Sequence, residues 1–393
     1  MRVVRQGVGI EDYAAVDFEG IRGLWTLPTT VLSGMHVDGQ PYDGVLVLGL
    51  LERTVFLEMD AEGGLEAVDR VAGLIDFEET IALKEVGGTV IQITTEQVHV
   101  TSQNLKVAGV SAKISAAQIT NDKILISSGR NLSLLNFQCQ SLHEWTLPQE
   151  ITCLDINGDL IIVGLWNSNV QIISLSDNST TQLDSALSAP ARSIIFSNIF
   201  NTLSMFIGSR DGTLTSYSLA DPSSPSEKKT VSLGTQPLHL FPLNTPTRDL
   251  IFASSDRPTL LHVPSKDRSK KLVISALSLK DVLSLTPLQH PAYPEALVLA
   301  TKEGFRIGKM DQMARLQVRS VGMPNGELPR RIARLDGEEK GGSSVVAVIS
   351  LKLDIDVDGS EKMHGYLRVW DEDTWQCKRF PFPAVYLFPR VRC

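Results

Sequence analysis

One hairpin pattern recurs along the chain, and it constrains the fold more than any other feature of the sequence. In each copy an apolar run ends near a small residue, a short polar turn follows, and a second apolar run begins; IIVGLWNSNVQIISL, residues 161–175, shows this most clearly. Successive anchors are 33 to 47 residues apart. The small anchor residues are Gly49, Thr94, Ser127, Gly164, Gly208, Ala253 and Ala300.

The spacing of these anchors predicts a β-propeller. Four-stranded propeller blades repeat at roughly 40–45 residues, with loops absorbing the variation. Runs of Val, Ile, Leu and Thr separated by Gly, Asn, Asp, Ser and Pro are typical of an all-β fold. We therefore predict a seven-bladed β-propeller over residues 1–322, with a β-sandwich or a pair of barrels as the alternative. We attribute the small side chains at the anchors to steric crowding, because the inner strands of a propeller converge on a narrow channel.

The sequence after residue 322 changes character. Turn-forming segments at 324–331 and 337–344 precede SVVAVISLKLDI and HGYLRVWDEDTWQ, which resemble opening strands of a further unit. We predict that residues 323–393 are the first strands of an incomplete next propeller, with an irregular C-terminal end in RFPFPAVYLFPRVRC. The chain is accordingly expected to be a fragment of a larger protein.

Charge and composition exclude several classes of protein. A net charge of −8 makes the chain a poor non-specific binder of phosphate backbones, which require a basic surface. The four cysteines form no C-x-x-C pair, as expected for a reducing intracellular compartment. No run of 18 apolar residues is present, so the sequence predicts no transmembrane helix and no membrane partner.

Motifs for catalysis, cofactors or metals are missing from the sequence. The seven histidines are scattered, and there is no G-x-S-x-G elbow, P-loop or G-x-G-x-x-G helix start. DIDVDGSEKMHG at 354–365 matches the first EF-hand positions, but Gly365 stands where a bidentate Glu is required. We expect an acidic hairpin loop there, no metal, no cofactor and no catalytic residue. A propeller enzyme, the alternative, would need carboxylates or histidines clustered at the channel mouth.

Trp166 is unexpected at the edge of its polar turn. A tryptophan there either packs between neighbouring blades or stays exposed to anchor a partner, since it offers a large apolar area at low entropic cost. The residues alone favour packing between neighbouring blades, with the partner contact as the alternative.

The chain resembles the damage-specific DNA-binding protein 1 family, which is related to propeller subunits of polyadenylation and splicing factors. The likeness falls in the central part of that family and covers nearly the whole chain to about residue 323. The stretches that carry it, in the same order, are GVGIEDYAAVDFEGIRGLW (7–25), VIQITTEQVHVTS (90–102), IIVGLW (161–166), VSLGTQP (231–237), FASSDRPT (252–259) and IGKMDQMARLQVRSVGM (307–323).

The resemblance implies a non-enzymatic scaffold of a cullin 4-type ubiquitin ligase acting in DNA damage recognition and repair. In that family the middle of three propellers docks the N-terminal region of cullin 4. The flanking propellers, absent from this chain, hold substrate receptors, and damaged DNA is reached indirectly through a receptor. The implied location is the nucleus, with the cytoplasm as a second compartment. The alternative is a nucleic-acid-associated scaffold subunit of an mRNA polyadenylation or splicing factor.

The resemblance also implies where the cullin docks. The tryptophan of the motif GLW, here Trp166, lies on the cullin-binding face of the family, and Ala14 in EDYAAVD matches a second contact position. Their neighbours Tyr13 and Asn167 complete the set of candidate interaction residues.

Overall fold

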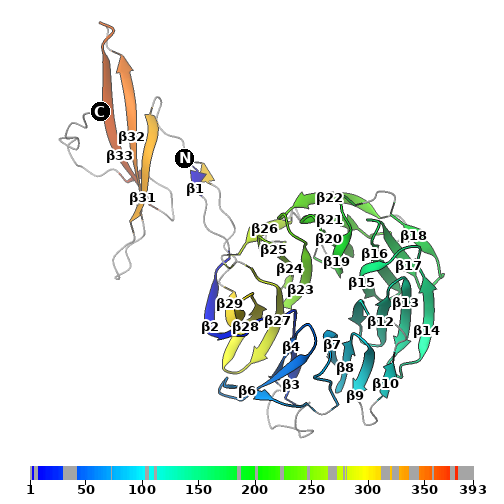
Figure 1. The fold of residues 1–393 in the computed structure, drawn as a ribbon. Helices are drawn as coiled ribbons and strands as arrows, with labels where there is room; N and C mark the ends of the chain where they lie inside the picture. The colour runs from blue at the N-terminus through cyan, green and yellow to red at the C-terminus, as the bar shows by residue number, and fades with distance from the viewer. Residues whose placement is uncertain are drawn as a thin grey trace. The chain divides into compact units, whose positions relative to one another are not determined.

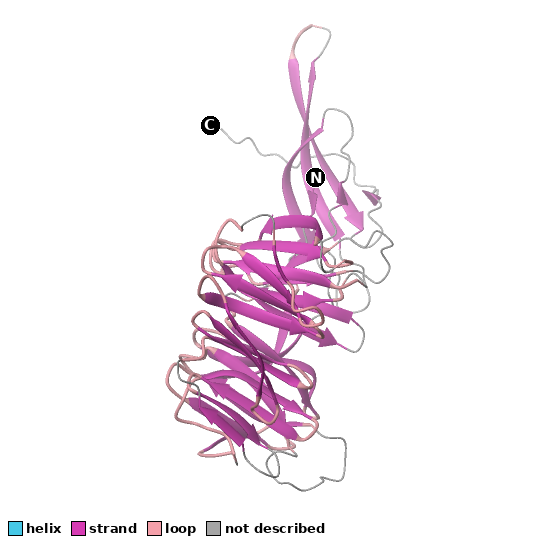
Figure 2. Ribbon diagram, turned by 90° about the vertical axis from the view of Figure 1, so that its right-hand side faces the viewer, coloured by secondary structure: helices cyan, strands magenta, loops and turns pink. Residues whose placement is uncertain are grey.

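The computed structural model describes residues 2–3, 8–29, 42–71, 73–101, 106–109, 113–183, 187–199, 202–221, 225–245, 248–263, 272–277, 279, 281–310, 319–320, 327–335, 345–355, 358–371 and 377–378. All regular secondary structure in these ranges is β-strand (Figure 2). The chain divides into two compact units, one of residues 6–315 and one of residues 1–5 with 316–393. The predicted domain boundary at 322/323 stays a prediction.

The described residues of the first unit form seven antiparallel sheets of four strands each. Three sheets consist of β3 (Gly23–Pro28), β4 (Asp43–Gly49), β5 (Thr54–Met59) and β6 (Leu65–Val68); β7 (Thr80–Val86), β8 (Thr89–Thr94), β9 (Gln97–Thr101) and β10 (Lys106–Gly109); and β11 (Ala116–Ile119), β12 (Lys123–Ser128), β13 (Asn131–Asn136) and β14 (Ser141–Thr146).

Four further sheets complete the unit. They consist of β15 (Ile151–Asn157), β16 (Leu160–Leu165), β17 (Val170–Ser174) and β18 (Thr180–Gln182); β19 (Ala191–Ser197), β20 (Ser204–Ser209), β21 (Thr213–Ser218) and β22 (Ser226–Ser232); β23 (His239–Thr245), β24 (Arg248–Ser254), β25 (Thr259–His262) and β26 (Val273–Ala276); and β27 (Ser284–His290), β28 (Tyr293–Ala300), β29 (Gly304–Met310) and β2 (Ile10–Asp17).

The seven sheets close into a ring (Figure 1). The first strands touch in an unbroken cycle, from β3 through β7, β11, β15, β19, β23 and β27 back to β3. These first strands surround the central channel, and the fourth strands lie on the outside. A closed ring leaves each sheet covered on both faces by its neighbours, which is the propeller architecture that the anchors predicted.

The last sheet of the ring is completed by the start of the chain. β2 pairs antiparallel with β29, from Ile10 opposite Met310 to Asp17 opposite Gly304. One apolar cluster spans this sheet and the next, because Phe305 and Ile307 of β29 pack with Leu46 and Leu48 of β4. The two ends of the ring are thus joined by backbone hydrogen bonds and by a shared core.

The described residues of the second unit form one four-stranded sheet and one two-stranded sheet. The four-stranded sheet comprises β31 (Glu327–Leu335), β32 (Val345–Ile355), β33 (Glu361–Asp371) and β34 (Cys377–Lys378), and β1 (Arg2–Val3) pairs with β30 (Arg319–Ser320). The EF-hand-like stretch 354–365 spans the end of β32 and the start of β33, which pair as far as Ile355 opposite Glu361, as the predicted hairpin requires; residues 356–357 lie outside the described residues. Asp354 is paired with Lys352 at 2.7 Å on the strand. The closing segment at 379–393 lies outside the described residues.

The small anchors all lie at or next to the last residue of the second strand of their sheet. A Cβ added to Gly164 would come within 2.8 Å of Ala191 Cβ in the next sheet, and one on Gly208 within 2.5 Å of the Leu238 carbonyl oxygen. Channel crowding is therefore the wrong explanation, because the first strands line the channel. The anchors are small because the start of the next sheet packs directly on them.

We predict that Gly208→Ala lowers the free energy of unfolding by about 1–3 kcal/mol, the usual cost of overpacking. The added methyl group would meet a backbone oxygen, which cannot rotate away. Gly49→Ala is the comparison: its closest atom is the edge of the Trp25 ring at 2.9 Å, and its nearest backbone atom, the Thr80 oxygen, is 3.2 Å away, so the loss should be smaller than at Gly208. Denaturant unfolding of both variants measures the difference; equal losses would contradict the packing explanation.

Asp155 joins three neighbouring sheets through one buried carboxylate on β15. Its Oδ1 accepts hydrogen bonds from Gln118 Nε2 at 2.8 Å and from Ile156 N at 2.9 Å, and its Oδ2 accepts one from Phe196 N at 2.7 Å. Burial raises the pKa of Asp155 to about 6, although the three donors favour the ionised form. The carboxylate is therefore mostly ionised at neutral pH and holds the β11, β15 and β19 sheets together.

We predict that Asp155→Ala destabilises the ring by about 3 kcal/mol, because buried N–H groups lose a charged acceptor.

A second variant, Asp155→Asn, keeps the size of the side chain and removes its charge, so it isolates the contribution of the titrating carboxylate. The folded pKa lies above the ordinary value of 3.8, so stability from this titration is full at low pH and is lost as pH rises through about 6. The stability of the wild type relative to Asp155→Asn should fall by about 2 kcal/mol between pH 4.5 and 7.5. Denaturant unfolding at both pH values measures this, and a pH-independent difference would refute it.

Candidate protein-docking face

The ring has one end at which the second strand of every sheet stops, and we call this end the anchor face. It carries the turns between second and third strands, at residues 50–53, 95–96, 129–130, 166–169, 210–212, 255–258 and 301–303. The first strand of the following sheet starts beside each anchor, as the Gly164–Ala191 and Gly49–Thr80 contacts show. The anchor face is therefore built from seven equivalent turns around the channel mouth.

Trp166 lies on the anchor face, in the turn between β16 and β17. Its backbone N–H donates to the Glu150 carbonyl oxygen at 3.0 Å, and Leu165 N donates to the Asn169 oxygen at 2.9 Å. Ser168 takes a left-handed conformation with φ of 66°, which allows the tight turn. The backbone beneath Trp166 is thus held in place by hydrogen bonds.

The side chain of Trp166 is 54 % exposed, so it is not buried between neighbouring sheets. The Arg210 guanidinium, from the next turn of the anchor face, lies 5.5 Å from the centre of the ring. A cation–π contact of this kind contributes roughly 0.5–1 kcal/mol at an exposed site. It keeps the indole oriented while leaving more than half of its surface available to a partner.

Asn167 has a local structural role. Its Oδ1 accepts a hydrogen bond from Asn169 N at 3.3 Å, which supports the turn that presents Trp166.

Tyr13 and Ala14 lie on β2, in the sheet that closes the ring. The pairing with β29 is irregular between Asp12 and Ala14, and Tyr13 at this irregularity is 38 % exposed, with its ring 5.8 Å from that of Tyr293. Ala14 is half-buried against the apolar cluster shared with the first sheet. Substituting Ala14 would therefore disturb the core as well as any docking surface.

The structure does not bring the four candidate residues together. The sheet of Trp166 and Asn167 is three steps around the ring from the sheet of Tyr13 and Ala14. Figure 1 shows β16 and β2 on opposite sides of the channel. A partner that contacted both groups would have to reach across the ring.

Two further exposed residues were missed by reasoning from the sequence. Among the described residues of the ring, the three most exposed large apolar side chains are Phe77 at 68 %, Leu51 at 61 % and Trp166 at 54 %. Leu51 lies in the turn 50–53, and Phe77 lies just before β7, so all three are on the anchor face. The sequence signal that could have identified Leu51 is a large apolar residue in a polar turn: Leu51 lies in LLER (50–53), as Trp166 lies in GLW (164–166).

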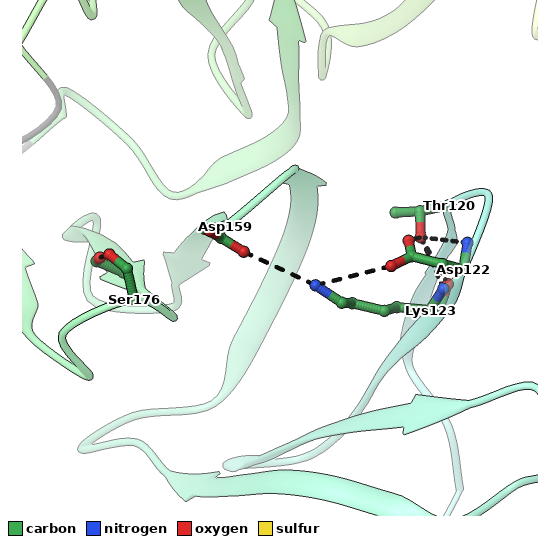
Figure 3. A network of polar contacts seen from close by, with 6 residues as sticks. Thr120, Asp122, Lys123, Asp159 and Ser176 are labelled. Atoms are coloured by element: carbon green, nitrogen blue, oxygen red, sulfur yellow. Dashed lines mark hydrogen bonds and ion pairs between the residues drawn. The ribbon is translucent and has the colours of Figure 1, made fainter.

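The opposite end of the ring is held by polar contacts (Figure 3). Lys123 Nζ lies 3.9 Å from Asp122 and 3.8 Å from Asp159 of the next sheet, and the Thr120 hydroxyl accepts from Lys123 N at 2.9 Å. Exposed ion pairs of this geometry add little stability. Among the described residues of the ring, the three most exposed large apolar side chains lie on the anchor face rather than at this end.

Chemical groups suited to catalysis are not assembled in the part of the ring that the structure describes. At the channel mouth Arg192 Nε donates to His239 Nε2 at 3.2 Å, and burial together with the charge of Arg192 lowers the pKa of His239 to about 4. Burial raises the pKa of the Cys153 thiol to about 12.

No group of three potential metal ligands occurs among the described residues. Nor do these residues include a helix long and apolar enough to cross a membrane.

These features define a closed β-propeller that exposes large apolar side chains at one end of the ring. The RSE1/DDB1/CPSF1 second beta-propeller family matches residues 10–310, and the chain belongs to this family. The resemblance seen in the sequence is thereby confirmed, and so is the all-β propeller fold.

Several curated proteins are similar over almost the whole chain. DNA damage-binding protein 1 of Drosophila melanogaster is 31 % identical over 385 residues, covering 92 % of this chain and 32 % of that protein. The proteins of the same name from Solanum lycopersicum and Oryza sativa subsp. japonica are each 29 % identical, covering 96 % and 98 % of this chain. The chain spans about a third of the length of these relatives.

Proposed function

We propose that this chain is a non-enzymatic scaffold which docks the N-terminal region of cullin 4 through Trp166 on the anchor face. Membership of the propeller family and the relatives named DNA damage-binding protein 1 support a scaffold role. The single observation that carries the docking site is the exposed, backbone-fixed indole of Trp166. A large apolar group held rigidly at the surface loses little entropy on binding.

The proposal extends to the wider complex in which the chain acts. In this proposal the cullin 4 ligase acts in the recognition and repair of damaged DNA in the nucleus, and the parts of the longer protein outside this chain hold substrate receptors. Damaged DNA is reached through such a receptor. The charge of −8 supports this indirect role, since direct binding of a phosphate backbone requires cations.

A scaffold subunit of an mRNA polyadenylation or splicing factor is the second candidate, because the matching family also includes CPSF1 and RSE1. Affinity purification of the tagged chain from nuclear extract separates the two. Recovery of cullin 4 supports the first proposal, and recovery of a pre-mRNA processing complex without cullin supports the second.

We predict that Trp166→Ala weakens binding to the cullin 4 N-terminal region by about 2 kcal/mol, or roughly thirtyfold. The same change should cost the fold less than about 1 kcal/mol, because the indole is more exposed than buried. Isothermal titration measures the affinity, and denaturant unfolding measures the stability.

Leu142→Ala is the matched control, since Leu142 is 45 % exposed but lies on the outer strand β14. It should bind cullin like the wild type. Unchanged binding by Trp166→Ala would refute the proposed docking site.

A further inference from the structure

Leu51 and Phe77 form a second exposed apolar patch on the anchor face. The segments that carry them are joined at Thr54, three residues after Leu51: Thr54 N donates to the Asp76 oxygen at 2.7 Å, and Thr54 Oγ1 donates to the Glu78 oxygen at 2.8 Å. These bonds fix the loop residues on either side of Phe77 beside the turn that holds Leu51. We call this pair the Leu51–Phe77 patch.

The loop that carries Phe77 is firmly built. Ile75, two residues earlier, is only 7 % exposed, and its N–H and carbonyl oxygen are both bonded by the Gln92 side chain, at 2.7 and 2.8 Å. Arg22 pairs with Glu79 at 2.9 Å on the other side of Phe77. The exposure of Phe77 therefore follows from a defined backbone that directs this side chain outward.

Carboxylates surround the patch. Glu52 follows Leu51 in the turn, Asp76 precedes Phe77, and Glu96 is exposed at the next turn of the anchor face. The Glu78 carboxylate, on the other side of Phe77, is already bonded by the side chains of Thr94 and Gln97. The nearby cations are fewer, since Arg22 is already paired with Glu79 and Arg53 is the other basic residue of the turn. An apolar patch inside an acidic rim is complementary to a segment with apolar and basic residues.

The patch and Trp166 share a face but not a sheet. Leu51 belongs to the sheet of β3–β6, and Trp166 belongs to the sheet three steps further around the ring. A partner that binds Trp166 and extends across the channel mouth would therefore also contact the Leu51–Phe77 patch. Two separated apolar contacts also raise affinity, because the second contact forms intramolecularly.

We propose that the Leu51–Phe77 patch is a second docking site, which binds a basic amphipathic segment of the same partner that docks at Trp166. The identity of that partner rests on the proposed function. The chemistry of the segment rests on the patch itself: leucine-like side chains cover Leu51 and Phe77, and lysine or arginine faces the carboxylates.

Two titrations of the full 393-residue chain test this site. The first uses a synthetic amphipathic helix of leucine and lysine, with a leucine–glutamate helix of the same pattern as the charge control. The second uses the cullin 4 N-terminal region. The variants are Leu51→Ser/Phe77→Ser, Trp166→Ala and the outer-strand control Leu142→Ser, with denaturant unfolding to confirm that each is folded.

We expect the double variant to bind the leucine–lysine helix and the cullin region about tenfold more weakly than the wild type. Trp166→Ala should weaken only the cullin interaction, and Leu142→Ser neither. If the double variant binds the leucine–lysine helix as tightly as the wild type, the second site is refuted. If it loses the helix but keeps full cullin affinity, the segment does not come from that partner. If the wild type binds no cullin while the double variant still loses the helix, the proposed function fails and the patch stands as a site.

Discussion

The pairing of β2 with β29 is the constraint on which the rest of the ring depends. Without it the sheet of β27–β29 would expose an unpaired edge, and the first and last sheets would not share a core. An unpaired edge strand costs hydrogen bonds and invites aggregation. With β2 in place every sheet has four strands and two neighbours, and the turns of the anchor face are held in fixed positions around the channel.

The contacts between sheets are specific rather than merely apolar. Small anchors let each sheet approach the next, and polar groups on the first and second strands then bridge the gap. Asp155 links three sheets, Ser193 Oγ accepts from Leu240 N at 3.1 Å, and Asp43 accepts from Gln289 N at 2.7 Å across the closing junction. Such buried bonds require one relative placement of neighbouring sheets. The spacing between Trp166 and the Leu51–Phe77 patch is consequently a fixed property of the ring.

Local features of this fold could be predicted from the sequence, and long-range ones could not. The hairpins around Gly164 and Gly208 are encoded by contiguous residues, so their positions were found correctly. The physical role of the anchors was misjudged, because the Leu238 oxygen that excludes a side chain at Gly208 comes from another sheet. The closing strand was missed for the same reason: Ile10 and Met310 are neighbours only in space. The exposure of Trp166 could be suspected from its turn, whereas that of Phe77 depends on the buried Gln92 that holds its loop.

The closure by β2 also bears on how the protein is made. Synthesis delivers β2 first and its partner β29 last, after every other strand of the ring has been translated. During that interval β2 has no strand to pair with, and Ala14 and Val16 lack the apolar cluster that covers them in the finished ring. Contacts between residues so distant in sequence form slowly, and exposed strands on nascent chains are prone to misassociation. The ring therefore cannot close before residue 310 has been synthesised, and until then β2 remains an unpaired strand.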